Sequence, residues 1–501
     1  MKKMWGLGIE VGLVSHGRVR TIVGVIALFL LSMAAVQAQT YTVMYAFPSG
    51  GNGANPTNPG TIAQGRDGSL YSTTLDGCGG FNLFGEVFKI SPAGTFKTVL
   101  CLNNPKYTNL GGPYSGVTLG TDGNFYGTSN GGDYLGSIWK VSAAGKLNVF
   151  SPFSAEPNIF GPNAPPVLGM DGNWYGAATS GGSGCTYGSG GCGGIYKISS
   201  AGKKYKDLHL FDATHGGNSF TPLLLASDGN FYGVTSLGGT GGGFQFGPGV
   251  LFKMTPSGTY SVLYDFCSVS NCLDGGLPYA GLAQGTDGDF YGTASTGGTR
   301  KYAGSSPGGV VFKISGTGVY SVLYNFCSQT SCTDGNYPLG GLALGSDGNF
   351  YGTTFYGGAH NYGTIYQITP AGVETVLYSF DNTTGAYPEG TLLQHTNGVL
   401  YGDTHNGGTS NYGVFFSLKA GLPTFAQLVT WWGKPGATIG ILGQGFKTAT
   451  GVSFNGVPAT SFKATGDTYI SATVPVGATS GKVTVTTASG TLTSSQVFVV
   501  Q

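Results

Sequence analysis

Short apolar runs separated by glycine-rich turns recur along most of the chain. Residues 346–354 are typical, with an Asp-Gly pair followed by Asn-Phe-Tyr-Gly-Thr-Thr. Successive residues of a strand point to opposite faces, so Phe350 and Tyr351 predict a strand that is covered on both faces. Asp-Gly between two apolar runs predicts a hairpin with a type I′ turn, in which glycine takes a positive φ.

Versions of this turn occur seven times, 49 to 60 residues apart. The turn residues are Asp67, Asp122, Asp171, Asp228, Asp287, Asp347 and, in a degenerate form, Asn397. In the sixth unit, strands are expected at residues 341–345, 349–354, 363–368 and 374–380. No run of ten residues has helical periodicity, so each unit is predicted to be a four-stranded antiparallel propeller blade.

The seventh unit lacks a fourth strand. It stops after residues 412–418, whereas units five and six end in Val-Leu-Tyr-x-Phe. A matching strand occurs near the other end of the chain, at residues 41–47. Pairing of this strand with the seventh unit would close the ring and remove an exposed sheet edge. The pattern therefore predicts a seven-bladed β-propeller over residues 39–420, closed by an N-terminal strand.

The pattern changes after about residue 421, where Thr/Val alternation replaces the Asp-Gly-aromatic repeat. Strands are expected at residues 437–442, 451–454, 468–474, 481–487 and 495–499. Short alternating strands over some 80 residues predict a small immunoglobulin-like β-sandwich, residues 421–501.

The first 38 residues resemble an export signal. Four basic residues precede an apolar run of 16 residues, and Val36-Gln37-Ala38 offers small residues for cleavage. The alternative is a retained membrane anchor, but a spanning helix needs about 20 apolar residues. We therefore expect a secreted or surface-located protein with no transmembrane anchor once the signal is removed. The remaining chain has 19 basic and 21 acidic residues, a net charge of −2.

Composition limits the classes of partner. The 93 glycines alone would suggest a flexible chain, but 13% aromatic and 40% hydrophobic residues favour packed strands. Charged residues amount to only 9%, so we expect no nucleic-acid partner.

The eight cysteines all follow the signal segment. They lie as local pairs: Cys78 with Cys101, Cys185 with Cys192, Cys267 with Cys272, and Cys327 with Cys332. Even number, local spacing and export favour disulfides. Zinc is the alternative, but no histidine lies near either C-x4-C pair.

Two resemblances follow from these motifs. The repeat L-x-x-G-x-D-G-N-F-Y-G-T-T…V-L-Y-x-F, over about residues 41–418, resembles the GloVer tandem repeat of exported bacterial "choice-of-anchor" proteins, which implies a surface or secreted protein without an assigned activity. The shorter Asp-Gly-Asn-aromatic turn also resembles NHL-type propeller repeats. Residues 439–446 (IGILGQGF), 452–459 and 474–477 resemble an IPT/TIG domain, although Trp431-Trp432 departs from that pattern.

The charged residues offer no catalytic, cofactor-binding or metal site that we can name. Calcium binding at the turn aspartates would need six to eight oxygens, and only one turn, with Asp287 and Asp289, has a second carboxylate. A lysine recurs in the third strand, as Lys89, Lys140, Lys197, Lys253 and Lys313. These lysines would either line a surface for anionic glycans or, as we favour, reach the turn aspartates.

Aromatic and amide side chains in the long loops are the best binding candidates. They are Tyr134, Phe355, Tyr356, Asn361, Tyr362, Asn411 and Tyr412. Flat rings stack on sugar faces and amides bond to hydroxyls, although aromatics that fill gaps between blades are an alternative.

These features favour a non-enzymatic binding or adhesion protein that recognises an extracellular glycan or protein. The alternative is a polysaccharide-cleaving hydrolase or lyase, which needs a convergent carboxylate or a Lys/Tyr/His cluster. A purely structural matrix module is a third possibility.

Overall fold

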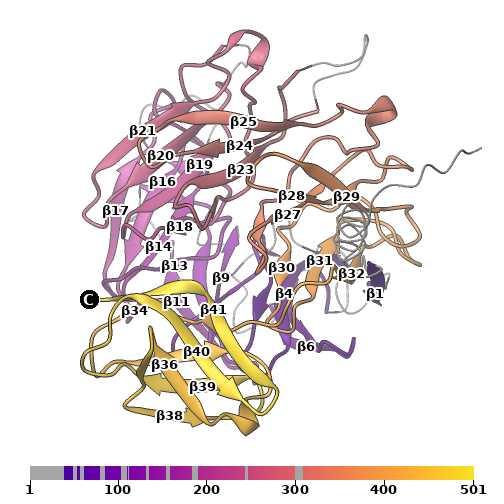
Figure 1. Ribbon diagram of the computed structural model, residues 1–501. Helices are drawn as coiled ribbons and strands as arrows, with labels where there is room; N and C mark the ends of the chain where they lie inside the picture. Colours follow the sequence, from indigo (N-terminus) through magenta and orange to yellow (C-terminus); the bar gives the residue numbers. More distant parts are fainter. Residues whose placement is uncertain are drawn as a thin grey trace, which may run out of the picture. The chain divides into compact units, whose positions relative to one another are not determined.

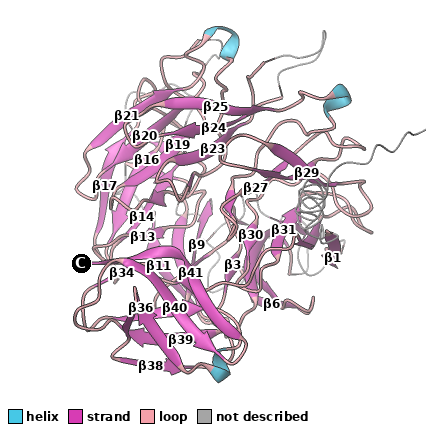
Figure 2. Ribbon diagram, in the orientation of Figure 1, coloured by secondary structure: helices cyan, strands magenta, loops and turns pink. Residues whose placement is uncertain are grey.

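Short antiparallel strands dominate the computed structural model (Figure 1). The structure describes residues 39–48, 54–56, 61–78, 85–102, 110, 112–130, 135–153, 158–182, 190–242, 246–299 and 308–501. Residues 1–38, for which the sequence predicts an export signal, therefore lie outside the described residues, as do Tyr134 and Cys185. Within the described ranges the helices are three short 3-10 turns, η2 (Ser270–Cys272), η3 (Thr330–Cys332) and η4 (Phe446–Thr448), as Figure 2 shows. None of them has the length and apolar character that crossing a membrane would require.

The sixth repeat illustrates the basic unit. Its strands are β26 (Ala343–Leu344), β27 (Phe350–Thr354), β28 (Thr364–Ile368) and β29 (Glu374–Ser379), and each pairs with the next along the chain. All five residues of β27 are buried, because neighbouring sheets cover both faces of the strand. The four strands lie within the predicted ranges; the first is three residues shorter than predicted and each of the others is one residue shorter.

Six further sheets in the described part of the chain follow the same plan. The first holds β2 (Ala54–Pro56), β3 (Ala63–Gln64), β4 (Leu70–Asp76), β5 (Glu86–Ile90) and β6 (Phe96–Cys101). The second holds β7 (Gly112–Pro113), β8 (Thr118–Leu119), β9 (Phe125–Asn130), β10 (Ser137–Val141) and β11 (Leu147–Pro152). The third holds β13 (Val167–Leu168), β14 (Trp174–Ala178), β16 (Gly194–Ile198) and β17 (Tyr205–Leu210), beside the short pair β12 (Ile159–Phe160) and β15 (Ser180–Gly181).

The fourth, fifth and seventh sheets have four strands each. The fourth sheet holds β18 (Leu224–Leu225), β19 (Phe231–Thr235), β20 (Val250–Met254) and β21 (Tyr260–Asp265). The fifth holds β22 (Ala283–Gln284), β23 (Phe290–Ala294), β24 (Val310–Ile314) and β25 (Tyr320–Asn325). The seventh holds β30 (Leu393–Gln394), β31 (Leu400–Thr404), β32 (Val414–Lys419) and, from the other end, β1 (Thr40–Ala46).

The predicted pairing between the two ends of the repeat region is present. Strand β1 runs antiparallel to β32, with Tyr41 opposite Leu418 and Ala46 opposite Val414. The amide of Phe47 extends the pairing, donating to the carbonyl of Gly413 at 3.0 Å. The strand nearest the N-terminus therefore completes the last sheet.

Aromatic residues join each sheet to the next. The tyrosine that follows the turn packs against the first aromatic residue of the same strand in the next repeat. The ring centroids are close in all five pairs: Tyr71 and Phe125 (3.9 Å), Tyr126 and Trp174 (4.0 Å), Tyr175 and Phe231 (4.2 Å), Tyr232 and Phe290 (4.0 Å), and Tyr291 and Phe350 (4.1 Å). Tyr351 then shares a buried cluster with Leu400, and Tyr401 shares one with Leu70. Because the last sheet packs on the first, the arrangement is a β-propeller.

The turn itself differs from the predicted type. Gly348 has the expected positive φ, 84°, and its amide donates to the carbonyl of Gly345 at 3.0 Å. Asp347, however, does not have a positive φ, which a type I′ turn would require. Instead its carboxylate accepts hydrogen bonds from the Asn349 amide (3.1 Å) and side chain (2.7 Å). These bonds hold the aspartate in an ordinary conformation, so the type I′ prediction is wrong.

The C-terminal residues form two further sheets. One holds β33 (Gln427–Leu428), β35 (Thr438–Leu442), β39 (Tyr469–Thr473) and β38 (Ser461–Ala464); the other holds β34 (Trp432–Gly433), β41 (Gly490–Val500), β40 (Gly481–Thr487), β36 (Gly451–Phe454) and β37 (Val457–Pro458). Their common core contains Ile441, Phe454, Ile470 and Phe498, all fully buried.

Specific contacts join these two sheets to the propeller. The guanidinium of Arg66 lies 4.5 Å from the ring centre of Tyr469, and Thr468 donates to the carbonyl of Arg66 at 2.7 Å. Trp431 packs against the C-terminal core and also against the cluster around Leu223 and Met254. Trp431 is therefore a packing residue between the two regions.

Disulfides link three of the four predicted cysteine pairs: Cys78–Cys101, Cys267–Cys272 and Cys327–Cys332. The latter two close small rings beside η2 and η3, directly after the outer strands β21 and β25. The fourth pair includes Cys185, which lies outside the described residues.

Candidate functional site

The recurring lysines are held at the turns, as we favoured from the sequence. Each ammonium forms an ion pair with its turn aspartate: Lys89–Asp67 (2.9 Å), Lys140–Asp122 (3.3 Å), Lys197–Asp171 (2.7 Å), Lys253–Asp228 (3.0 Å) and Lys313–Asp287 (2.8 Å). In the sixth repeat Gln367 takes the place of the lysine and donates to Asp347 at 3.3 Å. The five cations are thus neutralised locally and do not form a free basic surface.

The same turns bind the tyrosine of the following strand. In the third repeat the Tyr175 hydroxyl donates to Asp171 at 2.7 Å. Burial alone would raise the pKa of Asp171, but hydrogen bonds from Lys197, Asn173 and Tyr175 outweigh it and lower the pKa to about 2. The carboxylate therefore stays ionised and structural, and it is not a proton donor at neutral pH.

The loops of the sixth repeat bring five aromatic rings together. We call them the loop aromatic cluster: Tyr337, Phe355, Tyr356, Tyr362 and Tyr387. Phe355 stacks on Tyr387 with ring centroids 5.0 Å apart, and Tyr356 meets Phe355 edge-on at 4.6 Å. Tyr362 lies 5.7 Å from Tyr387, and Tyr337 lies 6.4 Å from Phe355. Tyr356 is 40% exposed, so the cluster presents an aromatic face to solvent.

The backbone under this cluster has an unusual conformation. Tyr337 and Tyr387 both have left-handed backbones, with φ of 61° and 58°, and both precede a proline. Large residues rarely adopt this region, which costs about 1–3 kcal/mol. Hydrogen bonds hold each one: the Tyr337 amide donates to Gly308 at 2.8 Å and the Tyr387 amide to Tyr362 at 2.9 Å. The backbones of Tyr337 and Tyr387 are therefore fixed by hydrogen bonds to neighbouring loops.

The sequence predicted only part of this cluster. Phe355, Tyr356 and Tyr362 were candidates, whereas Tyr337 and Tyr387 were missed. A signal was present, because Tyr-Pro occurs at the same place in two successive repeats, at residues 337–338 and 387–388.

The other candidates lie elsewhere or support their own loops. The side-chain oxygen of Asn361 accepts from the Gly357 amide at 3.0 Å, and that of Asn411 accepts from the Gly407 amide at 3.0 Å. Tyr412 packs against the core cluster around Phe47 at the junction of the seventh and first sheets. Tyr134 lies outside the described residues.

A carboxylate and an imidazole lie directly beside the loop aromatic cluster. Glu389 Oε2 is 3.9 Å from His405 Nδ1, and the His405 amide donates to the carbonyl of Tyr387 at 3.2 Å. Burial lowers the pKa of His405, although Asp76 acts in the opposite direction. The imidazole is therefore neutral at pH 7 and can accept a proton.

Asp403 lies two residues before His405, on β31. Its side chain is almost fully buried, and Oδ2 has no hydrogen-bond partner among the described residues. Burial raises the pKa of Asp403 to about 7. In the fifth and sixth repeats a threonine occupies this place, and each donates to a carbonyl of the next repeat: Thr293 to Gly340 (3.0 Å) and Thr353 to Gly390 (3.4 Å). Asp403 thus puts a buried acid where those repeats have a neutral hydroxyl.

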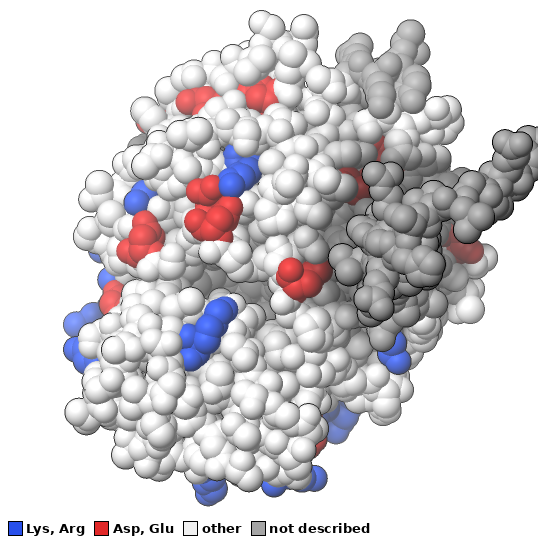
Figure 3. All heavy atoms as spheres, viewed as in Figure 1, with Lys and Arg blue, Asp and Glu red and all other residues white. Residues whose placement is uncertain are grey.

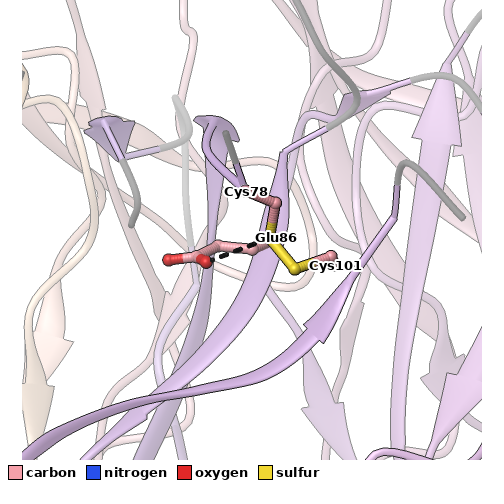
Figure 4. Close-up of side chains that lie close together, drawn as sticks. All are labelled: Cys78, Glu86 and Cys101. Carbon is pink, nitrogen blue, oxygen red and sulfur yellow. Dashed lines mark hydrogen bonds between the residues drawn. A yellow bond between two sulfur atoms is a disulfide. The ribbon is translucent and has the colours of Figure 1, made fainter. Parts of the chain in front are cut away.

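A second buried acid, Glu86, lies beside a disulfide (Figure 4). Its Oε2 is 3.4 Å from Cys78 Sγ and accepts a hydrogen bond from Thr98 at 3.0 Å. Burial raises the pKa of Glu86 to about 7, although the bond from Thr98 lowers it somewhat. Cys78, Glu86 and Cys101 are close enough to share an ion, but the two sulfurs are bonded to each other. In the disulfide form the group therefore offers one carboxylate and no thiolate.

Solved structures show a distant similarity. A fungal alcohol oxidase in complex with copper is 12% identical, with a TM-score of 0.47 over 89% of this chain and 98% of the other. An oligogalacturonate lyase in complex with manganese is 11% identical, with a TM-score of 0.43 over 78% and 94%. A gluconolactonase from Xanthomonas campestris is 14% identical, with a TM-score of 0.34 over 63% and 91%. Similarity at this level carries no argument about function.

The sequence comparisons give a clearer result. No curated protein matches the chain significantly. The profile of the Gloeobacter/Verrucomicrobia repeat matches residues 101–305 and 243–464, which together exceed half of the chain. The protein therefore belongs to the Gloeobacter/Verrucomicrobia repeat family.

Proposed function

We propose that the protein is an exported, non-enzymatic surface or secreted protein that binds an extracellular glycan through the loop aromatic cluster. The observation that carries the proposal is the packing of five aromatic rings, two of which belong to tyrosines with left-handed backbones. Aromatic rings bury large areas with little loss of side-chain freedom, and their flat faces match the apolar faces of sugars. Because the rings are already positioned before binding, little conformational entropy is lost when a ligand binds.

The proposal also assigns each region of the chain to a signal peptide or a domain. Residues 1–38 are a signal peptide, residues 39–420 a seven-bladed propeller closed by β1, and residues 421–501 an immunoglobulin-like domain of the IPT/TIG type. The pairing of β1 with β32 supports the closure, and the two C-terminal sheets around one core support the sandwich. The three disulfides favour an oxidising compartment outside the cytoplasm.

Replacing the exposed ring tests the binding surface. We expect Tyr356→Ala to weaken glycan binding by about 2 kcal/mol, roughly a thirtyfold rise in Kd, because an exposed anchor ring is lost. The measurement is binding of residues 39–501 to a glycan array, followed by titration calorimetry on the best ligand.

Phe462→Ala is the matched control, because Phe462 is 37% exposed but lies on β38 of the C-terminal sheets. It should leave the Kd unchanged. Binding that is equally strong in Tyr356→Ala and the control would contradict the proposed surface.

The Glu389–His405 pair favours a second candidate, a polysaccharide-cleaving enzyme of the hydrolase or lyase type. A neutral imidazole beside a carboxylate can take up and return a proton, and the aromatic cluster would hold the chain next to it. If this candidate is correct, the protein should release reducing ends or unsaturated sugars from a polysaccharide. Glu389→Gln and His405→Asn should each lower kcat by about a hundredfold or more. Absence of such products with the unaltered protein across a polysaccharide panel would contradict it.

A further inference from the structure

A cavity of about 420 Å³ lies between the propeller and the C-terminal sheets, away from the loop aromatic cluster. Its propeller wall comes from three successive inner strands, β18, β22 and β26, through residues such as Leu225, Gln284 and Leu344. Its other wall comes from Trp431 and from residues of β40 and β41. Ligand sites are common where two domains meet, and the volume suits a sugar of one or two units.

Among the described residues, one cation and no acidic residue line the cavity. That cation is Lys482 on β40, whose ammonium donates to the carbonyl of Ser495 at 2.5 Å. Burial lowers the pKa of Lys482. The nearby Asp287 and Asp289 are both already paired with Lys313, each at 2.8 Å. Figure 3 shows a hollow on this face with a basic side chain at its edge.

This lysine contrasts with the five of the propeller. Each of those is neutralised by a turn aspartate, whereas Lys482 has a carbonyl oxygen as its hydrogen-bond acceptor. Lys482 as a residue is exposed, so solvent screens its charge in part, and its role in the cavity rests on its position in the lining and on the absence of a carboxylate partner among the described residues.

The other residues that line the cavity indicate which chemical groups a bound anion would carry besides its negative charge. Trp431 supplies an aromatic ring, and Gln496 supplies an exposed amide with donors and an acceptor. A single cation suits a singly charged carboxylate better than a phosphate, which carries more charge and takes several donors. An aromatic ring and an amide suit a sugar ring with its hydroxyls.

We propose that this cavity binds a carboxylate-bearing sugar, a uronic acid of one or two units, with its carboxylate on Lys482 and its ring against Trp431. This site goes beyond the binding function proposed above and does not depend on the loop aromatic cluster.

Titration of residues 39–501 with galacturonate, digalacturonate, glucose and benzoate tests the proposal. We expect a uronate to bind at least tenfold more tightly than glucose, which lacks the charge, and than benzoate, which lacks the hydroxyls. In Lys482→Met, which keeps the aliphatic stem, uronate binding should fall at least tenfold because a charge-assisted hydrogen bond is lost.

Lys463→Met is the matched control, because Lys463 is an exposed lysine of β38 in the same pair of sheets. It should bind uronate as the unaltered protein does, and so should Tyr356→Ala, which separates this site from the loop aromatic cluster. A thermal unfolding scan should show that Lys482→Met is folded, and if it is not, Trp431→Phe with its smaller ring takes its place. Equal binding of glucose or benzoate, no uronate binding, or unchanged binding in Lys482→Met would overturn the proposal.

Discussion

A protein shortened to begin at Pro48 is expected to lose its cooperative thermal unfolding transition and to self-associate. Strand β1 covers the edge of β32, and the Tyr41 ring stacks on Tyr378 at 3.8 Å. Phe47 is fully buried against Phe88 and Phe415 at the junction of the last and first sheets. Without these residues β32 becomes an exposed apolar edge, which is a template for pairing with other chains. Circular dichroism during heating and size-exclusion chromatography measure both effects.

Single substitutions at Phe47 and Val43 measure how much individual side chains of this segment contribute to stability. Phe47→Ala should lower the free energy of unfolding by about 3–5 kcal/mol, the usual loss for a buried phenylalanine. Val43→Ala is the control on the same strand; because Val43 is 36% exposed, the loss should be below about 1 kcal/mol. Adding a peptide of residues 39–48 to the shortened protein should restore the transition. A shortened protein that remains monomeric and unfolds like the full one would show that β1 does not hold the ring closed.

Asp403→Asn is expected to stabilise the protein at pH 8 by about 4 kcal/mol. Burial raises the pKa of Asp403 to about 7 from an ordinary value of 3.8, and each pKa unit corresponds to about 1.4 kcal/mol. Above pH 7 the folded protein must hold a buried carboxylate without a hydrogen-bond partner among the described residues. Asparagine removes the charge at nearly the same volume. The measurement is urea unfolding at pH 5 and pH 8.

The direction of the pH dependence follows from the same pKa. Between pH 4 and pH 7 the unfolded chain releases the Asp403 proton before the folded protein does, so stability falls as pH rises through this range. Glu86 and Glu374, whose pKa values burial likewise raises to about 7, contribute in the same direction. The slope should therefore be steepest in the unaltered protein and shallower, but not absent, in Asp403→Asn.

Replacing Asp403 with the residue found at the equivalent position of the fifth and sixth repeats tests the same explanation. Asp403→Thr introduces the residue that donates to the next repeat at positions 293 and 353, and it should also stabilise the protein at pH 8. If neither variant gains stability at pH 8, or if the gain is as large at pH 5, then ionisation of Asp403 is not the source of the instability.

The order of the propeller strands is largely encoded locally. The repeated Asp-Gly-x-aromatic turn marks where the first and second strands meet, and both can be read from a few neighbouring residues. The closing strand could also be predicted, because one repeat lacks its last strand and the same pattern occurs near the other end. The type of turn could not, because the side-chain hydrogen bonds of Asp347 and Asn349 override the usual preference for Asp-Gly.

The sequence by itself determined the repeats, their strands and the closing strand, because short-range alternation and turn chemistry carry that information. Only the tertiary structure decided which side chains from separate loops come together. Tyr337 and Tyr387 are 50 residues apart in the sequence. Glu389 and His405 lie at opposite ends of the β30–β31 hairpin in the sequence, and the fold brings their side chains close together. The cavity at Lys482 needs three propeller strands and two C-terminal strands at once. Such proximity depends on how the sheets pack around the ring, and local sequence does not specify it.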